Sequence, residues 1–399
     1  MKKGLQTHEL RNRIIFTLIV LAVYLLGRCV PLFGAGRGGN AQGMASTREM
    51  AAMMFSGDRY QTSLMALGVL PYINASLLVQ VVSALRSVNS RARVSKQKMD
   101  RWMIIVTTIF AAGMAAAQAM NLASGAGGNT VLIGVLAALE MFAGAMLTCL
   151  LCMKNEKYGI GASMPIILMN ILVSLAATMS AHHFLRYPLI FLICIVVIIV
   201  TVVMENKLIR LPLQRVSVHN IHAEQNYIAY KLNPTGIMPV MFATAAFLVP
   251  RYIAAILAHL FPLSRQLADM RQNMVVTRPL GIIVYLIIIL LLSVVFAFIM
   301  LNPRESARQL QKNGDSIIGI YAGKATTACL VSLVWKLSLL SGIFQAFCMG
   351  LSLIPSSRGM LPPALTMIPS AAMILVSILC SLIQEIRTYR RYDAYSFFL

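Results

Sequence analysis

Long apolar stretches alternate with short polar ones along the whole chain, and most of the apolar stretches are long enough to cross a bilayer. A transmembrane helix needs about 20 predominantly apolar residues. Ten stretches come close to this length, at 14–30, 64–85, 102–122, 131–152, 161–181, 187–204, 236–260, 280–301, 326–350 and 363–385. The pattern predicts an all-α polytopic membrane protein with ten transmembrane helices.

The second stretch contains Ala66–Val82, which is apolar but interrupted by polar and turn-forming residues. These are Pro71, Tyr72, Asn74, Ser76 and Gln80. Polar groups in hydrocarbon are costly unless they face protein or water. We therefore expect this helix to line a cavity or a seam between helices.

A short Ala- and Met-rich segment, 46–55, lies just before that helix and after a glycine-rich run at 34–43. It begins with Ser46-x-x-Glu49, the pattern of a helix capping box. Its length is about half of what a span needs. A short helix placed directly before a helix that lines a cavity predicts a pathway with a stopper.

The chain divides evenly into five predicted spans in residues 1–185 and five in residues 186–399. An odd number of spans in each half makes the halves run in opposite directions across the membrane. Such inverted repeats place a site or pathway at their interface. The halves share no clear residue-level repeat, so the expected symmetry rests on the number of spans.

Two polar segments are longer than ordinary connections, at 205–233 and 302–324. Within the first, Leu211–Val218 and Tyr227–Leu232 alternate partially between apolar and polar residues, and 219–226 is rich in turn formers. This pattern predicts a β-hairpin. Long loops on one face of a protein often bind a partner, although tolerated surface insertions remain an alternative.

Composition and charge agree with a membrane protein and fix its orientation. The chain is 58% hydrophobic and 12% charged, against about 25% charged residues in soluble domains. Of its 34 Lys and Arg residues, 23 fall on the side of the termini and 10 on the other side. Basic residues concentrate on the cytoplasmic side, so we expect both termini in the cytoplasm. Topology accounts for the net charge of +21, and no nucleic-acid partner is expected.

Few residues point to chemistry. Cys149 and Cys152 match C-x-x-C, and His219-x-x-His222 lies in the first long loop, but neither has the further ligands of a metal site. No nucleotide-binding or hydrolase motif occurs. We expect no catalytic residue, cofactor or metal. Of the two charges within spans, we expect Lys336 to extend toward the membrane surface, while Glu140 would be the coupling site if the protein were a solute transporter.

Six stretches in order carry a family resemblance. They are LRNRIIFTLIVLAVYLLGRCVPL (10–32), MFSGD (54–58), ALGVLPYINASLLVQ (66–80), GIGASMPII (159–167), KLNPTGIMPVMFATAAFLVP (231–250) and LNPRESARQLQKNGDSIIGI (301–320), followed by RRYDAY (390–395) near the tail. These residues resemble the SecY family of protein-conducting channels. The compact loops and the segment 215–234 are most similar to the accessory branch of Gram-positive bacteria.

The resemblance implies an hourglass pore between the halves, narrowed by an apolar ring, plugged by a short helix and opened sideways by a lateral gate. The ring would draw on Val69, Ile73, Leu168, Leu172, Met241 and Ala371. The plug would be 44–56, with Met44, Ser46, Glu49, Met53, Met54 and Phe55. The gate would use Asn74, Ser76, Gln80 and Thr244, and motor docking would use Arg215, His219, Tyr321 and Lys324. An apolar constriction can gate by dewetting.

Three positions depart from the family pattern. Ala162-Ser163-Met164-Pro165 stands where Asn-Gly-Ile-Ser is usual, and Gly57-Asp58 replaces a Gly-Gly beside the plug. Tyr321 replaces an arginine that serves motor and ribosome engagement in the family. This last change favours a dedicated partner over the standard docking mode.

The resemblance implies the central pore subunit of a preprotein translocase in the bacterial plasma membrane, serving accessory export of serine-rich glycoprotein adhesins. Its partners would be a SecA-type motor ATPase, a SecE-type small membrane subunit, accessory Sec proteins, unfolded polypeptide with a signal sequence, and the lipid bilayer. Alternatives are a general SecY channel, a secondary transporter using Glu140, and a membrane-embedded enzyme.

Overall fold

The computed structural model describes most of the chain, and the structural statements below concern that part. The described residues are 9–32, 63–89, 95–123, 130–181, 188–215, 227–247, 250, 253, 273–274, 278–321, 323–357, 365 and 368–395. The expected plug, 44–56, lies outside these residues, and so does His219.

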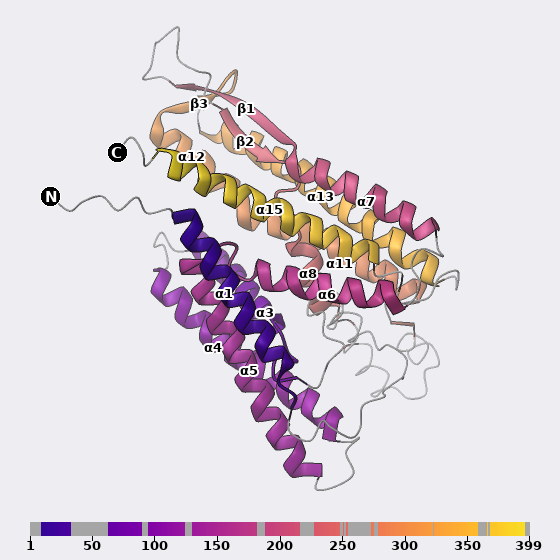
Figure 1. Ribbon diagram of the computed structural model, residues 1–399. Coiled ribbons are helices and arrows are strands. Elements are labelled where there is room, and N and C mark those ends of the chain that lie inside the picture. The colour runs from indigo at the N-terminus through magenta and orange to yellow at the C-terminus, as the bar shows by residue number, and fades with distance from the viewer. Residues whose placement is uncertain are drawn as a thin grey trace, which may run out of the picture. The chain divides into compact units, whose positions relative to one another are not determined.

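Helices make up most of the described structure (Figure 1). Their bounds are α1 Glu9–Cys29, α3 Leu70–Asn89, α4 Lys96–Ala123, α5 Thr130–Tyr158, α6 Met164–Ala181, α7 Pro188–Asn206, α8 Met238–Ala246, α11 Pro279–Leu301, α12 Pro303–Asn313, α13 Lys324–Ser357 and α15 Ile368–Tyr395. Each of the ten predicted spans overlaps one of these described helices, and α12 is the additional one. For the span predicted at 236–260 the overlap is limited to the nine residues of α8, Met238–Ala246.

The exposed faces of these helices are apolar, as a bilayer requires. Seven helices within the described residues are long and apolar enough to cross a membrane, and α3 and α6 contain shorter apolar segments. On α1 only Val20 and Tyr24 are buried, while Leu18, Ile19 and Leu26 are each more than half exposed. Apolar side chains directed outward along so many helices identify a multi-pass membrane protein.

The chain forms two compact units. The first comprises Met1–His183 and Ile378–Leu399. In it α4 packs against α3 and α5, and α1 packs against α5 and α6. One buried cluster of this unit is rich in alanine, whose small side chain lets helix backbones approach closely. The buried cluster is Leu32, Ala66, Leu67, Ala111, Ala115, Ala119, Ala137, Met141 and Ala145.

The second unit comprises Phe184–Ser377. Its α11 and α13 meet where Gly342 of α13 faces Ser293 of α11, and the Ser293 hydroxyl donates to the Ser338 carbonyl at 3.1 Å. The same helix, α11, packs against α8 through the Phe242 and Phe296 rings, whose centroids are 4.7 Å apart. Small residues at the contact with α13 and aromatic rings at the contact with α8 hold α11 against both helices.

A three-stranded sheet lies at one end of the helices of the second unit (Figure 1). Strands β1, Leu208–Arg215, and β2, Tyr227–Lys231, form the predicted antiparallel hairpin, with Leu208 opposite Lys231. The first strand begins at Leu208 rather than at the predicted residue 211. Leu208 is apolar but exposed, so the sequence there does not alternate between apolar buried and polar exposed residues. A third strand, β3, Asp315–Ile317, pairs with β1 and gives the order β2-β1-β3.

The segment before β3, predicted as part of a long loop, folds into α12. Pro303 occupies the first turn, where its missing N–H costs nothing, and Gly314 ends the helix with a left-handed φ of 73°. Pro303, Ala307 and Leu310 form its buried face. Together with β2, β3 and α13, this face makes the cluster of Tyr230, Ala307, Leu310, Ile317, Leu330 and Leu337.

Candidate functional site

The first pair of expected ring residues, Val69 and Ile73, is placed by a turn that precedes α3. This turn starts at a β-bridge between Pro31 and Ser63 and includes Gly68 with φ of 53°. Val69 and Ile73 are buried, and the Ile73 N–H donates to the Val69 carbonyl at 2.9 Å. Residues four apart share a helix face, so this pair presents one apolar surface from a rigidly held turn.

The second pair, Leu168 and Leu172, lies on α6 and shares one face of that helix. Leu168 is half-buried and Leu172 is exposed. The second unit supplies Met241, half-buried on α8, and Ala371, buried on α15. The ring assignment stays a prediction for all of these residues.

The loop that starts α6 is held by Asn155, which was not among the predicted site residues. The Asn155 amide nitrogen donates to the Ile160 carbonyl at 2.9 Å and to the Ala162 carbonyl at 2.7 Å. Ala162 has φ of 46°, in the left-handed region that asparagine or glycine occupies more readily. Asn155 therefore ties down the loop at the point where the chain lacks the usual asparagine. The sequence offers no local cue for this role, because Asn155 stands among Lys154, Glu156 and Lys157 at the polar end of α5.

Residues of α1 complete this cluster. The Ile160 N–H donates to the Thr17 hydroxyl at 3.0 Å. Arg13 donates to the Gly159 carbonyl at 3.1 Å, pairs with Glu9 at 2.9 Å, and lies over the Tyr389 ring at 4.6 Å. The α5–α6 loop is thus bonded to α1 on several sides, which fixes the start of the helix carrying Leu168.

The expected gate residues lie on α3 and α8. The Ser76 hydroxyl donates to the Ile73 carbonyl of its own helix at 2.9 Å. Asn74 and Gln80 are half-buried on α3. Thr244 belongs to α8, but its side chain lies outside the described residues. Polar groups that are partly accessible on an otherwise apolar helix suit a seam that opens, and the gate assignment stays a prediction.

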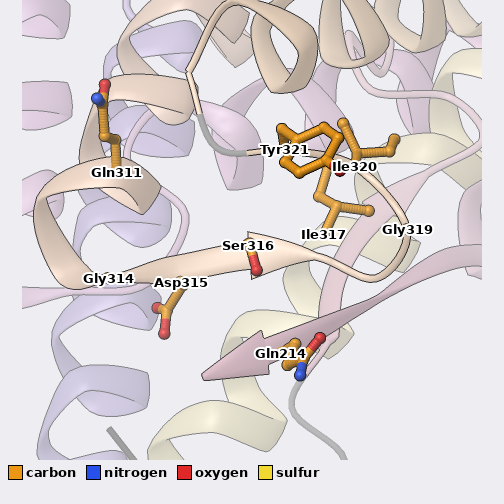
Figure 2. A pocket seen from close by; sticks show the side chains of 9 residues that line it. All are labelled: Gln214, Gln311, Gly314, Asp315, Ser316, Ile317, Gly319, Ile320 and Tyr321. Carbon is orange, nitrogen blue, oxygen red and sulfur yellow. The ribbon is translucent and has the colours of Figure 1, made fainter. Parts of the chain in front are cut away.

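The sheet and α12 form a platform with a pocket of about 530 Å³. Figure 2 shows the lining side chains coming from the end of α12, from β3 and the following turn, and from β1. They are Gln214, Gln311, Gly314, Asp315, Ser316, Ile317, Gly319, Ile320 and Tyr321. The pocket combines amide, hydroxyl and carboxylate groups with two isoleucines and an aromatic ring.

Of the four expected docking residues, Tyr321 lines this pocket and is 90% exposed. Lys324 is exposed at the start of α13. Arg215 lies opposite Asp315 in the β1–β3 register, and only its backbone is described. A large aromatic side chain exposed beside a polar pocket has the composition of a protein-binding anchor.

Tyr230, on β2, belongs to the buried cluster between the sheet and α12. It is buried, and burial raises the pKa of its hydroxyl above the usual value, although a hydrogen bond with Ser306 lowers it in part. Tyr230 therefore stays neutral through the physiological range and acts as part of the apolar support between β2 and α12.

Within the described residues, no group of three or more His, Cys, Asp or Glu side chains is placed to hold a metal ion. Cys149 and Cys152 are both buried on α5. Glu140 is half-buried on the same helix, and Lys336 is exposed on α13. The exposure of Lys336 suits a side chain that extends toward the membrane surface.

Comparisons with known proteins agree with this architecture. A family model described as SecY matches residues 63–383. The chain is 25% identical to an accessory Sec system protein translocase subunit SecY2 of Streptococcus sanguinis, over 96% of this chain and 97% of the relative. It is 26% identical to the protein translocase subunit SecY of Bacillus subtilis, over 86% of this chain and 85% of that relative. A solved structure described as that of a protein conducting channel superimposes with a TM-score of 0.65 at 19% identity. The match covers 96% of this chain and 93% of the solved chain.

Proposed function

This chain belongs to the SecY family, and we propose that it is the central pore subunit of a preprotein translocase in the bacterial plasma membrane. At the coarse level, it is a multi-pass membrane subunit of a protein-translocation channel. The observation that carries the proposal is the family match across 63–383 together with ten helices at the ten expected positions. The finer features below are proposals.

The channel belongs to an accessory export system and passes serine-rich glycoprotein adhesins as unfolded polypeptides. Support comes from the end-to-end match to a relative named as an accessory subunit. The match to the Bacillus subtilis SecY is similar in identity but covers less of either chain. The alternative is a general translocase channel, which would accept ordinary secretory proteins as well.

The apolar side chains of Val69, Ile73, Leu168, Leu172, Met241 and Ala371 line the narrowest part of the pathway. Aliphatic and methionine side chains re-pack around polypeptides of differing sequence. When no polypeptide is present, an apolar constriction excludes water and ions. The buried turn that holds Val69 and Ile73 and the bonded loop that starts α6 support the proposal, because both keep these side chains in fixed positions.

A SecA-type ATPase docks on the platform, which faces the cytoplasm along with both termini. The positive-inside distribution supports this orientation. The 90% exposure of Tyr321 beside the pocket supports a contact by aromatic packing, where the family uses an arginine. A SecE-type subunit and accessory Sec proteins complete the complex.

Crosslinking an arrested export substrate tests the pore. A photo-reactive amino acid at Ile73 or Leu168 is expected to capture a stalled adhesin segment. The same amino acid at Ile109, which is 67% exposed on α4, is the matched control and is expected to capture lipid only. Equal capture at all three positions would reject the pore assignment.

Depleting the protein and following two kinds of cargo separates the two proposed systems. An accessory channel predicts that export of a serine-rich glycoprotein stops while an ordinary signal-peptide protein is still secreted. Loss of both would identify a general channel. A solute transporter that relies on Glu140 predicts instead that Glu140→Gln abolishes solute uptake while protein export is untouched, so unchanged solute uptake in this variant would reject the transporter.

A further inference from the structure

A buried polar cluster in the second unit joins the segment before α8 to three other helices. Its members are Glu205 near the end of α7, Asn233 and Thr235 between β2 and α8, Ser341 and Gln345 on α13, and Ser377 on α15. Each of these side chains is at most 4% exposed. None of them belongs to the ring, plug, gate or docking residues discussed above.

Asn233 lies at the centre of the cluster. Its amide nitrogen donates to Glu205 Oε1 at 2.9 Å and to the Gly236 carbonyl at 3.3 Å. Its amide oxygen accepts from the Ser341 hydroxyl at 2.6 Å and from Gln345 Nε2 at 3.3 Å. One side chain therefore connects α7, α13 and the turn that leads into α8.

Glu205 is held from a second side, because the Ser377 hydroxyl also donates to Glu205 Oε1. A buried carboxyl group is costly unless its hydrogen-bonding capacity is used. Removing one donor from such a group leaves the rest of the group buried with fewer partners. For this reason Glu205 favours the one arrangement in which Asn233 and Ser377 both reach it.

Gln345 fastens the same turn from α13. Its amide nitrogen donates to the Gly236 carbonyl at 2.8 Å and to the Ser341 hydroxyl at 3.2 Å. Its buried amide oxygen has no hydrogen-bond partner among the described residues. Gln345 therefore contacts both the turn and the rest of the cluster through its amide nitrogen.

Gly236 makes the turn possible, with φ of 56°, and α8 begins two residues later at Met238. Met241 and Thr244 lie on the first turns of this helix. Any displacement at 233–236 is passed directly to both residues, since a helix moves as a rigid element over so short a distance.

We propose that Glu205 and Asn233 form a hydrogen-bonded clasp that positions the start of α8 and thereby holds the channel closed. They are positioning residues, which act on the pathway through Met241 and Thr244. The effect on the closed channel rests on the proposed function, whereas the effect on α8 does not.

The position of α8 is measured first, in purified protein and without translocation. Spin labels at Met238 and at Trp335, an exposed residue of α13, are introduced into a variant whose seven native cysteines are replaced. Trp335 is ten residues from Gln345, about 15 Å along the helix. We expect a narrow distance distribution in the parent, and a broadened or shifted one in Glu205→Ala and Asn233→Ala.

Conservative and matched variants distinguish a clasp from general damage. Glu205→Gln keeps an oxygen that accepts from Asn233 and Ser377, so the parent distribution is expected. Glu156→Ala changes a glutamate near the end of α5 that pairs with Lys96 at the surface, and no effect is expected. Ser341→Ala removes one hydroxyl with little loss of volume and is expected to broaden the distribution even if the larger truncations fail to fold.

Ion leak through the channel in liposomes is measured next. We expect at least about a tenfold increase for Glu205→Ala and Asn233→Ala, because a buried polar group that loses its hydrogen-bond partner shifts a two-state equilibrium by about that factor or more. The double variant should leak about as much as either single variant, since both changes break the same link.

Two outcomes would overturn the clasp. One is a parent-like distance distribution in Ser341→Ala and in every truncation that folds. The other is a double variant whose effect equals the product of the single effects. If the distances broaden and the leak stays at the parent level, the clasp stands and the proposed pore role of α8 is rejected.

Discussion

Replacing Gly144 with alanine is expected to destabilise the first unit and to displace the turn that carries Val69. A Cβ atom on Gly144 would lie 1.9 Å from the carbonyl oxygen of Leu64 and 2.8 Å from its carbonyl carbon. Ordinary van der Waals contacts of a Cβ begin at 3.4 Å. The shortest distance is therefore 1.5 Å below this limit. The clashing atoms belong to the backbone, which cannot rotate aside as a flexible side chain does.

The cost follows from what the two segments must give up when they separate. Overpacking a filled interior costs about 1–3 kcal/mol. The separation also weakens the buried contact from the Thr148 hydroxyl to the Met65 sulfur, now at 3.1 Å. For domains of 150–250 residues each kcal/mol lowers the melting temperature by about 2–4 °C. We expect a fall of several degrees.

Thermal unfolding of the purified protein in detergent, followed by tryptophan fluorescence, measures this effect. Gly113→Ala on α4 is the matched control, because a Cβ there would meet no atom within 4 Å. Alanine favours a helix by up to about 1 kcal/mol over glycine, so this control is expected to melt at the parent temperature or slightly above. A Gly144→Ala variant that melts no lower than the parent would refute the reasoning.

Three further predictions concern the plug, the platform and the α5–α6 loop. Deleting Met44–Ser56 is expected to raise ion leak through the channel in liposomes, and unchanged leak and export would remove the plug assignment. Burial raises the pKa of Tyr230, so ionisation favours the unfolded chain: stability is full below about pH 10 and falls as the pH rises further. Tyr230→Phe is expected to weaken this alkaline loss of melting temperature, and an identical pH profile would contradict the assignment. Asn155→Ala removes the donors to Ile160 and Ala162 and is expected to cost about 1–3 kcal/mol, which a melting temperature equal to the parent's would exclude.

The sequence by itself determined the class of protein and the places of its ten helices. Length and apolarity suffice for this, because a bilayer accepts only segments whose backbone groups are bonded within the helix. It also predicted the hairpin, since the alternation in Tyr227–Lys231 and the turn formers before it are local signals. The segment 303–317 was predicted as a loop but forms α12 and β3. Pro303 and Gly314 are local signals for the two ends of this helix.

Only the tertiary structure decided which polar residues work together. Asn155 accepts a hydrogen bond from Thr17, which is 138 positions earlier in the chain. Glu205 accepts one from Ser377, which is 172 positions later. No local pattern encodes such pairings, because hydrogen bonds between distant residues depend on how helices pack and not on sequence spacing. Local composition therefore predicts the membrane spans, whereas the positions of α6 and α8 depend on hydrogen bonds between residues that are far apart in the sequence.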